Sequence, residues 1–358
     1  MKIAIILGTR PEIIKMAPVI RELEQRQSDY FLLHTGQHYS YNLDRVFFEQ
    51  LELPGARYNL EAGSGSHAEE TGKMLIGIEK ILAAERPHFV LVEGDTNSVL
   101  AGTLAATKLH IKVGHVEAGL RSYDRTMPEE VNRILADHVA DHLYAPTPKA
   151  REILLAEGIP DDKIYVTGNT IVDSVFQNVK LAEAKVNILN DLNLKAGAYL
   201  LVTLHRQENV DIKARFTSIL KGLSELSSEF ALPVIYPIHP RSRKRVQEFN
   251  LKADGVHLIE PVDFLSFLQL ESNARLILTD SGGVQEEACI LKVPCVTLRD
   301  NTERPETVEV GANILAGAIP AKIRECAHLM LARERDWANP FGDGRAGRRI
   351  IEIVEAAK

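Results

Sequence analysis

Cationic side chains directly after the first apolar segment indicate a binding site for an anion. Arg10 and Lys15 follow the run KIAIIL at residues 2–7 and lie where a helix is expected to begin. The free amides and the dipole of a helix N-terminus attract negative charge, and two cations strengthen that attraction. This segment therefore predicts a phosphate-type site, with a plain glycine turn and a solvated lysine as the alternative.

Carboxylates follow two further apolar runs and begin a later helix. Asp95 and Glu117 each come at the end of a run, and Glu129 follows a proline. His115 lies in the same run as Glu117, and an imidazole and a carboxylate are costly to bury without partners, so this pair indicates a functional site. Asp95 could instead be a helix N-cap, and Glu129 could belong to an ordinary acidic first turn.

The second half of the chain carries another group of polar residues at predicted strand ends. His205 follows the run YLLVTL, and Ser281, Gly282 and Gly283 join a later strand to a helix. The glycines allow a ligand to approach the backbone, the serine supplies a hydroxyl, and the helix N-terminus favours phosphate. Glu287 lies about one turn into that helix, where a carboxylate could accept hydrogen bonds from sugar hydroxyls.

Apolar runs that alternate with helical patterns must position these side chains. Strands are predicted in a first series at residues 2–7, 31–35, 89–93 and 112–117, and in a second series at 199–204, 233–237, 256–259, 276–279 and 294–298. Short β-branched runs separated by helices indicate parallel sheets covered on both faces. We therefore expect an α/β protein of two Rossmann-like domains whose parallel sheets face each other across a cleft, with a polar hinge near residues 181–197. Ligands of such sheets bind beyond the carboxyl ends of the strands.

Length and composition agree with two ordinary globular domains. The chain has 358 residues, 45% of them hydrophobic and 25% charged, and domains average roughly 150 residues. A net charge of −7 argues against general binding of nucleic acid. No apolar run has the roughly 18 residues of a membrane helix, and the opening segment lacks a signal-peptide cleavage site. Three cysteines without metal-type spacing are typical of reduced thiols, so we expect a cytoplasmic protein that binds neither nucleic acid nor membrane.

The motifs predict neither a cofactor nor a metal. The sequence lacks the G-x-G-x-x-G fingerprint, the P-loop pattern and the G-x-S-x-G elbow. His138 and His142 are spaced i, i+4 on an expected helix, but no glutamate follows the first one as in zinc protease motifs. We therefore expect this histidine pair to be structural.

Eight short motifs occur in order along the chain. They are GTRPEIIK (8–15), GDT (94–96), GHVEAGLR (114–121), PEEVNR (128–133), TGNT (167–170), HRQEN (205–209), TDSGGVQEEA (279–288) and ERPE (303–306). With these motifs the chain closely resembles the non-hydrolysing UDP-N-acetylglucosamine 2-epimerases over essentially its whole length. The resemblance implies a GT-B fold, usually a homodimer, with an N-terminal domain of residues 1–170 completed by a helix at about 345–358, and a UDP-binding domain of residues 171–344. It also implies an isomerase that interconverts UDP-N-acetylglucosamine and UDP-N-acetylmannosamine without a redox cofactor.

The chemistry implied by this resemblance agrees with the residue types. The C2 hydrogen of the sugar is not next to a carbonyl, so its direct removal is very unfavourable. Oxidation of a neighbouring hydroxyl by NAD would require the missing dinucleotide fingerprint. Elimination of UDP from C1, which forms 2-acetamidoglucal and is followed by re-addition, requires carboxylates near C2 and positive charge on the diphosphate.

The resemblance assigns roles to matching positions of this chain. Acid/base roles belong to Asp95, Glu117 and Glu129, with the individual assignment open. Arg10, Lys15 and His205 assist the nucleotide and its departure. The remaining substrate-binding positions are Arg133, Ser281, Gly282, Gly283, Glu287 and Arg304, with Ser281 and Gly283 on phosphate and Glu287 on the ribose. Bacterial members also bind UDP-N-acetylglucosamine as an activator, and the matching positions here are Gln37, His38, Arg206 and His239.

Two other functions stay open. Relatives that act on diacetamido-glucuronate sugars usually have alanine where Thr9 stands and glutamine where Glu12 stands. A non-catalytic regulator that binds nucleotide sugars could have the same fold, although all three candidate carboxylates are present. Both features favour the N-acetylglucosamine epimerase.

Overall fold

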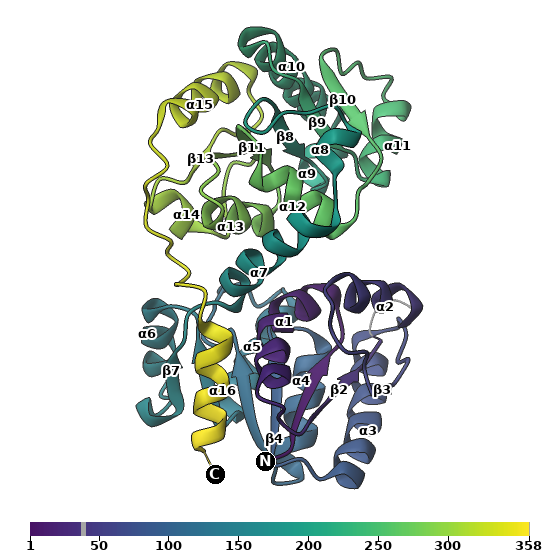
Figure 1. Ribbon diagram of the computed structural model, residues 1–358, viewed down its shortest axis with the longest axis vertical. Coiled ribbons are helices and arrows are strands. Elements are labelled where there is room, and N and C mark those ends of the chain that lie inside the picture. Colours follow the sequence, from purple (N-terminus) through teal and green to yellow (C-terminus); the bar gives the residue numbers. More distant parts are fainter. Residues whose placement is uncertain (37–40, 358) are drawn as a thin grey trace. The chain divides into compact units, whose positions relative to one another are not determined.

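The computed structural model describes residues 1–36 and 41–357, and the chain forms two compact α/β units (Figure 1). Unit 1 contains Met1–Gln177 and Phe341–Lys358, and unit 2 contains Asn178–Pro340. The divisions expected from the sequence were after residues 170 and 344. The chain leaves unit 1 within helix α7 (Thr170–Lys185).

Within residues 1–36 and 41–357, no helix has the length and apolar character that a membrane span requires.

Unit 1 is built on a seven-stranded parallel sheet in the order β3-β2-β1-β4-β5-β6-β7. Its strands are β1 (Ile3–Leu7), β2 (Tyr30–His34), β3 (Tyr58–Asn59), β4 (Phe89–Glu93), β5 (Lys112–Val116), β6 (His142–Ala145) and β7 (Ile164–Val166). Strands β1 and β4 are buried throughout, as expected for continuous apolar runs covered on both faces. The strand order reverses between β1 and β4, so the loops that follow these strands are neighbours at the carboxyl edge.

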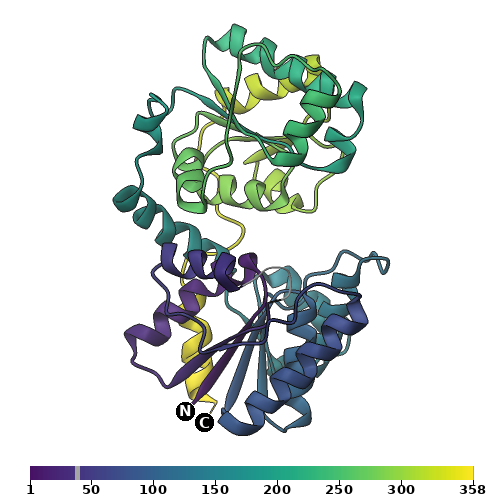
Figure 2. The ribbon, with the colours of Figure 1, turned by 90° about the vertical axis from the view of Figure 1, so that its right-hand side faces the viewer.

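Helices cover both faces of this sheet. They are α1 (Arg10–Gln25), α2 (Tyr41–Gln50), α3 (His67–Glu85), α4 (Asn97–Lys108), α5 (Pro128–Val139), α6 (Pro148–Ala156), the short 3-10 helix η1 (Asp161–Lys163), the first part of α7, and α16 (Ala346–Ala356). Helices α1 and α16 lie side by side on one face, and α3 and α4 lie on the other (Figure 2). Asp173 of α7 holds the C-terminal helix, because its carboxylate accepts hydrogen bonds from the amides of Ala346 (3.1 Å) and Gly347 (2.9 Å).

Unit 2 repeats this architecture with a six-stranded parallel sheet in the order β10-β9-β8-β11-β12-β13. Its strands are β8 (Leu200–Thr203), β9 (Val234–Pro237), β10 (Val256–Ile259), β11 (Leu276–Thr279), β12 (Cys295–Thr297) and β13 (Asn313–Leu315). Its helices are α8 (Ile188–Asp191), α9 (Gln207–Val210), α10 (Lys213–Phe230), α11 (Pro240–Glu248), α12 (Phe264–Ser272), α13 (Gly282–Ile290), α14 (Pro305–Glu309) and α15 (Pro320–Ala332). In this sheet the order reverses between β8 and β11.

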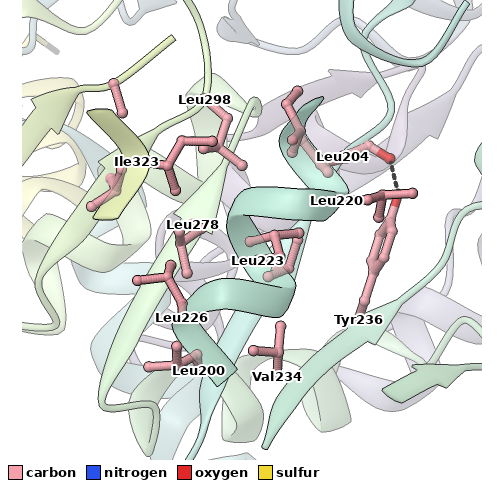
Figure 3. Packing of buried hydrophobic residues seen from close by; sticks show 14 of the residues in the cluster. Leu200, Leu204, Leu220, Leu223, Leu226, Val234, Tyr236, Leu278, Leu298 and Ile323 are labelled. Carbon is pink, nitrogen blue, oxygen red and sulfur yellow. Dashed lines mark hydrogen bonds between the residues drawn. The ribbon is translucent and has the colours of Figure 1, made fainter. Parts of the chain in front are cut away.

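The core of unit 2 fixes the loop that leads to His205. Leu220 and Leu223 of α10 pack against the sheet in a hydrophobic cluster (Figure 3). The buried hydroxyl of Tyr236 donates a hydrogen bond to the carbonyl oxygen of Leu204 at 2.7 Å (Figure 3), and the hydroxyl of Ser242 donates to the same oxygen at 2.7 Å. The residue before His205 is therefore held by the hydrophobic core.

The secondary structure differs from the sequence prediction in two respects. The sequence prediction missed strands β3, β6, β7 and β13, which have two to four residues each. The prediction that His138 and His142 share a helix is wrong, because α5 ends at Val139 and His142 begins β6.

Candidate active site

The loops after β1 and β4 are joined by the buried carboxyl group of Glu12. Its Oε2 atom accepts hydrogen bonds from the amides of Gly8 and Thr9, the latter at 2.9 Å. Its Oε1 atom accepts one from the hydroxyl of Thr96 at 2.5 Å. Burial raises the pKa of Glu12 to about 7, although these donors oppose the shift. Because Glu12 also occupies the capping-box position of α1, one residue both begins a helix and joins two loops of the site.

Lys15 lies against two carboxyl groups in unit 1. Its Nζ atom is 2.5 Å from Glu117 Oε2 and 3.2 Å from Glu93 Oε1. Burial raises the pKa of Glu93 well above its usual range, while Lys15 opposes this shift and Glu117 adds to it. The lysine expected to meet an anion is thus paired with acidic side chains in this structure.

Glu117 has a backbone conformation that is rare for a residue with a side chain. Its φ is +68°, in the left-handed region, directly after β5. That region costs a residue other than glycine about 1–2 kcal/mol, and such strain persists mainly where the surroundings enforce it, often at functional sites. Asn169 donates a hydrogen bond from Nδ2 to Glu117 Oε1 at 3.1 Å. An amide and a lysine therefore hold the two carboxylate oxygens of Glu117.

The side chain of Asp95 forms an ion pair and does not cap a helix. Arg133 binds Asp95 through Nη2, and its Nη1 atom is 3.1 Å from Glu130 Oε2. The N-cap of α4 is Thr96, whose hydroxyl accepts a hydrogen bond from the amide of Val99 at 3.4 Å. Asp95 keeps 35% of its side chain exposed, so its carboxylate is accessible to a ligand.

The two adjacent glutamates at the start of α5 have different surroundings. Glu130 is buried and accepts hydrogen bonds from the amides of Ser122 (2.9 Å) and Tyr123 (3.0 Å), so it holds the preceding loop. Glu129 is exposed and, among the residues that the structure describes, its side chain has neither a hydrogen bond nor an ion pair. Glu129 is therefore the glutamate of this pair that a ligand could reach.

A buried network supports the backbone beside Asp95. In His115, Nδ1 is 2.7 Å from Asp137 Oδ1 and Nε2 is 2.7 Å from the carbonyl oxygen of Gly94. Both partners are acceptors, so both ring nitrogens donate and the imidazole is positively charged. Burial disfavours that charge, but Asp137 outweighs it and the pKa of His115 is raised. Asp137 also pairs with Arg121 at 2.7 Å, which completes a buried group of one carboxylate and two cations.

In unit 2, the buried Asp280 organises the loop after β8. Its carboxylate accepts hydrogen bonds from the amides of His205 (3.1 Å) and Arg206 (3.0 Å) and from Nδ2 of Asn209 (3.1 Å). The ring Nδ1 of His205 lies 3.3 Å from Asp280 Oδ1. Burial opposes ionisation of Asp280, but these contacts lower its pKa. The side chain of His205 is still 45% exposed, so its ring is accessible while its backbone is fixed.

In the turn after β11, Gly283 is exposed and Gly282 is buried. A Cβ atom would be 3.7 Å from the nearest non-adjacent atom at Gly282 and 4.0 Å from it at Gly283. Packing against these neighbours therefore does not require glycine at either position, whereas close approach of a ligand would. Ser281 is the N-cap of α13, where the free amides favour an anion. This geometry fits the phosphate site expected from the sequence.

Glu287, the expected ribose ligand, meets a second buried carboxyl group, that of Glu271 on α12. Burial raises the pKa of Glu287 to about 7, and a hydrogen bond with Glu271 opposes the rise. Burial raises the pKa of Glu271 well above its usual range, and Glu287 adds to that shift. Burial and the neighbouring carboxyl group therefore favour the protonated form of Glu271.

Two arginines of the expected site have partners within their own unit. The guanidinium of Arg10 lies over the ring of Phe47, 4.9 Å from its centre. The Nε atom of Arg304 is 2.7 Å from Oε1 of Glu286, which is buried.

The residues expected to bind an activator are only partly described. Gln37 and His38 lie outside the described residues. Arg206 approaches Glu303 at 3.6 Å, and His239 is the N-cap of α11, where its Nδ1 accepts a hydrogen bond from the amide of Arg241 at 3.2 Å.

Several acidic residues of these networks were missed by sequence reasoning, among them Glu12, Glu93, Glu271 and Asp280. The T-x-x-E spacing of a capping box and an acid at the end of an apolar strand are signals that point to Glu12 and to Glu93. Glu271 lies within a helix and has no local signal, because its partner Glu287 is on another helix.

Known proteins resemble this chain over its whole length. The family model described as UDP-N-acetylglucosamine 2-epimerase matches residues 21–355. A UDP-N-acetylglucosamine 2-epimerase of Methanocaldococcus jannaschii is 56% identical over 365 residues, which cover 100% of both chains. A Pseudomonas aeruginosa UDP-2,3-diacetamido-2,3-dideoxy-D-glucuronate 2-epimerase is 43% identical over 99% of both chains. The crystal structure of the M. jannaschii UDP-GlcNAc 2-epimerase in complex with UDP-GlcNAc and UDP has a TM-score of 0.85 and 57% identity, and the match covers 99% of this chain and 100% of that chain. The chain therefore belongs to the UDP-N-acetylglucosamine 2-epimerase family, and its two parallel-sheet units have the GT-B-like fold of that family.

Proposed function

We propose that this protein is an isomerase that interconverts UDP-N-acetylglucosamine and UDP-N-acetylmannosamine. The observation that carries the proposal is the cluster of Lys15 and Glu117 at the carboxyl edge of the unit 1 sheet, with Asp95 on the neighbouring loop. Carboxylates and a cation at such an edge could supply the proton transfers and the positive charge that epimerisation at C2 requires. The 56% identity to an epimerase from M. jannaschii over the full chain supports the same activity.

The proposed reaction is an elimination followed by a re-addition. A carboxylate removes the proton from C2 while the bond between C1 and the UDP oxygen breaks, which forms 2-acetamidoglucal and UDP. UDP then adds back to C1, and C2 receives a proton on the opposite face. The sugar has the same oxidation state before and after, so the route requires no hydride acceptor.

Three carboxylates of unit 1 are proposed for the proton transfers. The exposure of Asp95 and Glu129 supports their access to substrate, and the enforced backbone conformation of Glu117 supports a functional role. Arg133 would orient Asp95. Lys15 and Arg10 would supply positive charge as the diphosphate leaves.

Residues of unit 2 are proposed to hold UDP. The amides at the start of α13 and the hydroxyl of Ser281 would bind phosphate oxygens. Arg304, which pairs with Glu286 of α13, is a further proposed substrate-binding residue. His205 would donate to the departing diphosphate, and Glu287 would accept hydrogen bonds from the ribose hydroxyls. We further propose, from the motif resemblance, a cytoplasmic homodimer and an activator site that includes Arg206 and His239.

Incubation with UDP-N-acetylglucosamine in D2O tests this function. The expected product is UDP-N-acetylmannosamine with deuterium at C2, formed without added NAD and in the presence of EDTA. Proton NMR reports the product and the loss of the C2 hydrogen together. Unchanged substrate without exchange would refute epimerisation, and free N-acetylmannosamine as the main product would instead indicate a hydrolysing enzyme.

UDP affinity should increase as the pH rises through about 7, the pKa to which burial brings Glu287. Ribose hydroxyls donate to the ionised carboxylate, so binding favours the ionised form and releases protons below this pKa. We expect a change of roughly two- to tenfold between about pH 6 and about pH 8, measured by calorimetry in buffers of different ionisation enthalpy. Glu287→Gln is the matched control, because it retains the shape and removes the titration of this carboxyl group. The same pH dependence in both proteins would contradict the role of Glu287.

A UDP-diacetamido-glucuronate is the second candidate substrate. The observation that favours it is the 43% identity to the P. aeruginosa enzyme over 99% of both chains. Epimerisation at C2 of that sugar could follow the same elimination. The ratio of kcat/KM for the two nucleotide sugars, measured in parallel, decides between them.

A further inference from the structure

Glu93 is a buried acid that the proposed mechanism does not use. It is the last residue of β4, directly before the Gly94-Asp95 loop, and its side chain is only 2% exposed. The ionisable groups that face it from neighbouring elements are Lys15 and Glu12 of α1 and Glu117 after β5. A carboxyl group in this position requires either a compensating charge or a proton of its own.

One ammonium group cannot compensate two neighbouring buried carboxylates. Lys15 Nζ is 2.5 Å from Glu117 Oε2, in a directed hydrogen bond, and 3.2 Å from Glu93 Oε1. The other oxygen of Glu117 accepts a hydrogen bond from Asn169 at 3.1 Å. Two adjacent carboxyl groups in a buried site do not both ionise at neutral pH. Since Glu117 has the closer ammonium and the amide donor, Glu117 is the ionised member and Glu93 is the member that keeps a proton.

The contacts of Glu93 agree with this distribution of charge. Both carboxyl groups contact the same Lys15 ammonium, so they are neighbours, and a hydrogen bond between two carboxyl groups requires that one of them carry the proton. Burial raises the pKa of Glu93 well above its usual range, Lys15 opposes the shift, and Glu117 and Glu12 add to it. The three residues Lys15, Glu117 and Glu93 then supply one ammonium, one carboxylate and one neutral acid, which is a balanced set for a buried site.

We propose that Glu93 is a positioning residue, a neutral carboxylic acid that donates a hydrogen bond to the Glu117 carboxylate and holds it for proton transfer. Glu117 thereby has three donors, namely Lys15, Asn169 and Glu93, and its orientation is fixed. Loss of the Glu93 proton would place two negative charges side by side and displace Glu117. The effect on turnover rests on the proposed function, whereas the protonation state of Glu93 does not.

Infrared difference spectroscopy tests the protonation state without any substrate. The spectrum of the wild type minus that of Glu93→Gln at neutral pH should contain the C=O stretch of a protonated carboxylic acid, and this band should shift in D2O. Glu152→Gln is the control, because the side chain of Glu152 is 65% exposed and its removal should affect only ionised-carboxylate bands. If the Glu93→Gln difference also contains only ionised-carboxylate bands, the inference is wrong whether or not the protein is an epimerase.

The pH profile of turnover tests the positioning role. Glu93→Gln keeps a donor that cannot ionise, so we expect a kcat within about threefold of the wild type and activity that persists to higher pH. Glu93→Leu removes the donor and should lower kcat roughly 10- to 100-fold with little change in KM, as expected for the loss of a hydrogen bond to a charged group. Identical pH profiles for wild type and Glu93→Gln, or wild-type kcat in Glu93→Leu, would overturn the positioning role. If Glu93→Leu does not fold, the spectrum and the profile of Glu93→Gln decide alone.

Discussion

Glu117→Gln should lower the kcat of epimerisation by roughly 100-fold or more, the scale expected for a group that transfers a proton in the transition state. The amide keeps the size of the side chain and can still contact Lys15, so UDP affinity should change much less. We expect the same result for Asp95→Asn and Glu129→Gln. Turnover measured by NMR and UDP binding measured by calorimetry separate the two effects.

A carboxylate from the loop before α5 provides the control for this series. Asp124 is exposed and accepts hydrogen bonds from the amide (2.9 Å) and the hydroxyl (2.6 Å) of Thr126. Asp124→Asn should leave kcat within about twofold, since surface changes of this kind have small effects. If the amide variants of Asp95, Glu117 and Glu129 all turn over at nearly the wild-type rate, these side chains are structural and another group must transfer the protons.

Asp137→Ala should destabilise unit 1 by about 3–5 kcal/mol, because it leaves two buried cations without their shared partner. Asp137 contacts His115 and Arg121, each at 2.7 Å, and also accepts a hydrogen bond from the amide of Gly119 at 3.1 Å. Hydrogen exchange of the amides in β5 and α5 should report this loss. Asp137→Asn, which keeps the shape of the side chain and a hydrogen-bond acceptor, should destabilise unit 1 less than Asp137→Ala.

The single tryptophan of the chain provides an internal reference for that measurement. Trp337 lies in unit 2, where it is buried and donates a hydrogen bond to the carbonyl oxygen of Cys289 at 3.0 Å. Its fluorescence should therefore show an unchanged unfolding midpoint in Asp137→Ala. Unchanged hydrogen exchange in β5 and α5 would mean that the contacts of Asp137 with His115 and Arg121 contribute little to the stability of unit 1.

The buried pair of His115 and Asp137 predicts how the stability of unit 1 depends on pH. The pKa of His115 is raised above 6.5 in the folded state. Its contribution to the free energy of unfolding is therefore fully present below pH 6.5 and is lost as the pH rises through the pKa of the folded state. The pKa of Asp137 is lowered from 3.8, because His115 and Arg121 outweigh the opposing effect of burial. Its contribution is present above 3.8 and is lost as the pH falls through the folded value. Asp137→Asn should weaken both dependences.

The sequence alone was sufficient for the central strands and for the parallel α/β class of both units. Strands β1, β4, β8 and β11 are continuous apolar runs because helices cover them on both faces, and this pattern is readable from neighbouring letters. The carboxyl ends of parallel strands share one edge of a sheet, which is why polar residues after separate runs could be proposed as candidate site residues. The short strands at the sheet edges, such as β3 and β13, had too few apolar residues to be predicted.

The roles of individual side chains required the tertiary structure, because they depend on partners far away in the sequence. The sequence allows either Asp95 or Thr96 to cap α4. In the structure Asp95 forms an ion pair with Arg133, and Thr96 caps the helix. Glu129 and Glu130 are adjacent in the sequence, yet the fold of the preceding loop buries only Glu130.

The charge state of the buried acids was likewise decided by the fold. Lys15 and Glu117 are 102 positions apart, and their contact exists only because β1 and β4 are neighbours in the sheet and β5 pairs with β4. The proton that we assign to Glu93 depends on that contact and on burial, since desolvation disfavours charge and neighbouring charges shift the balance. Local sequence patterns report periodicity and strand ends, but neither desolvation nor a distant counter-charge. The sequence could therefore propose candidate site residues at strand ends, while the ionisation of these groups followed from the packed structure.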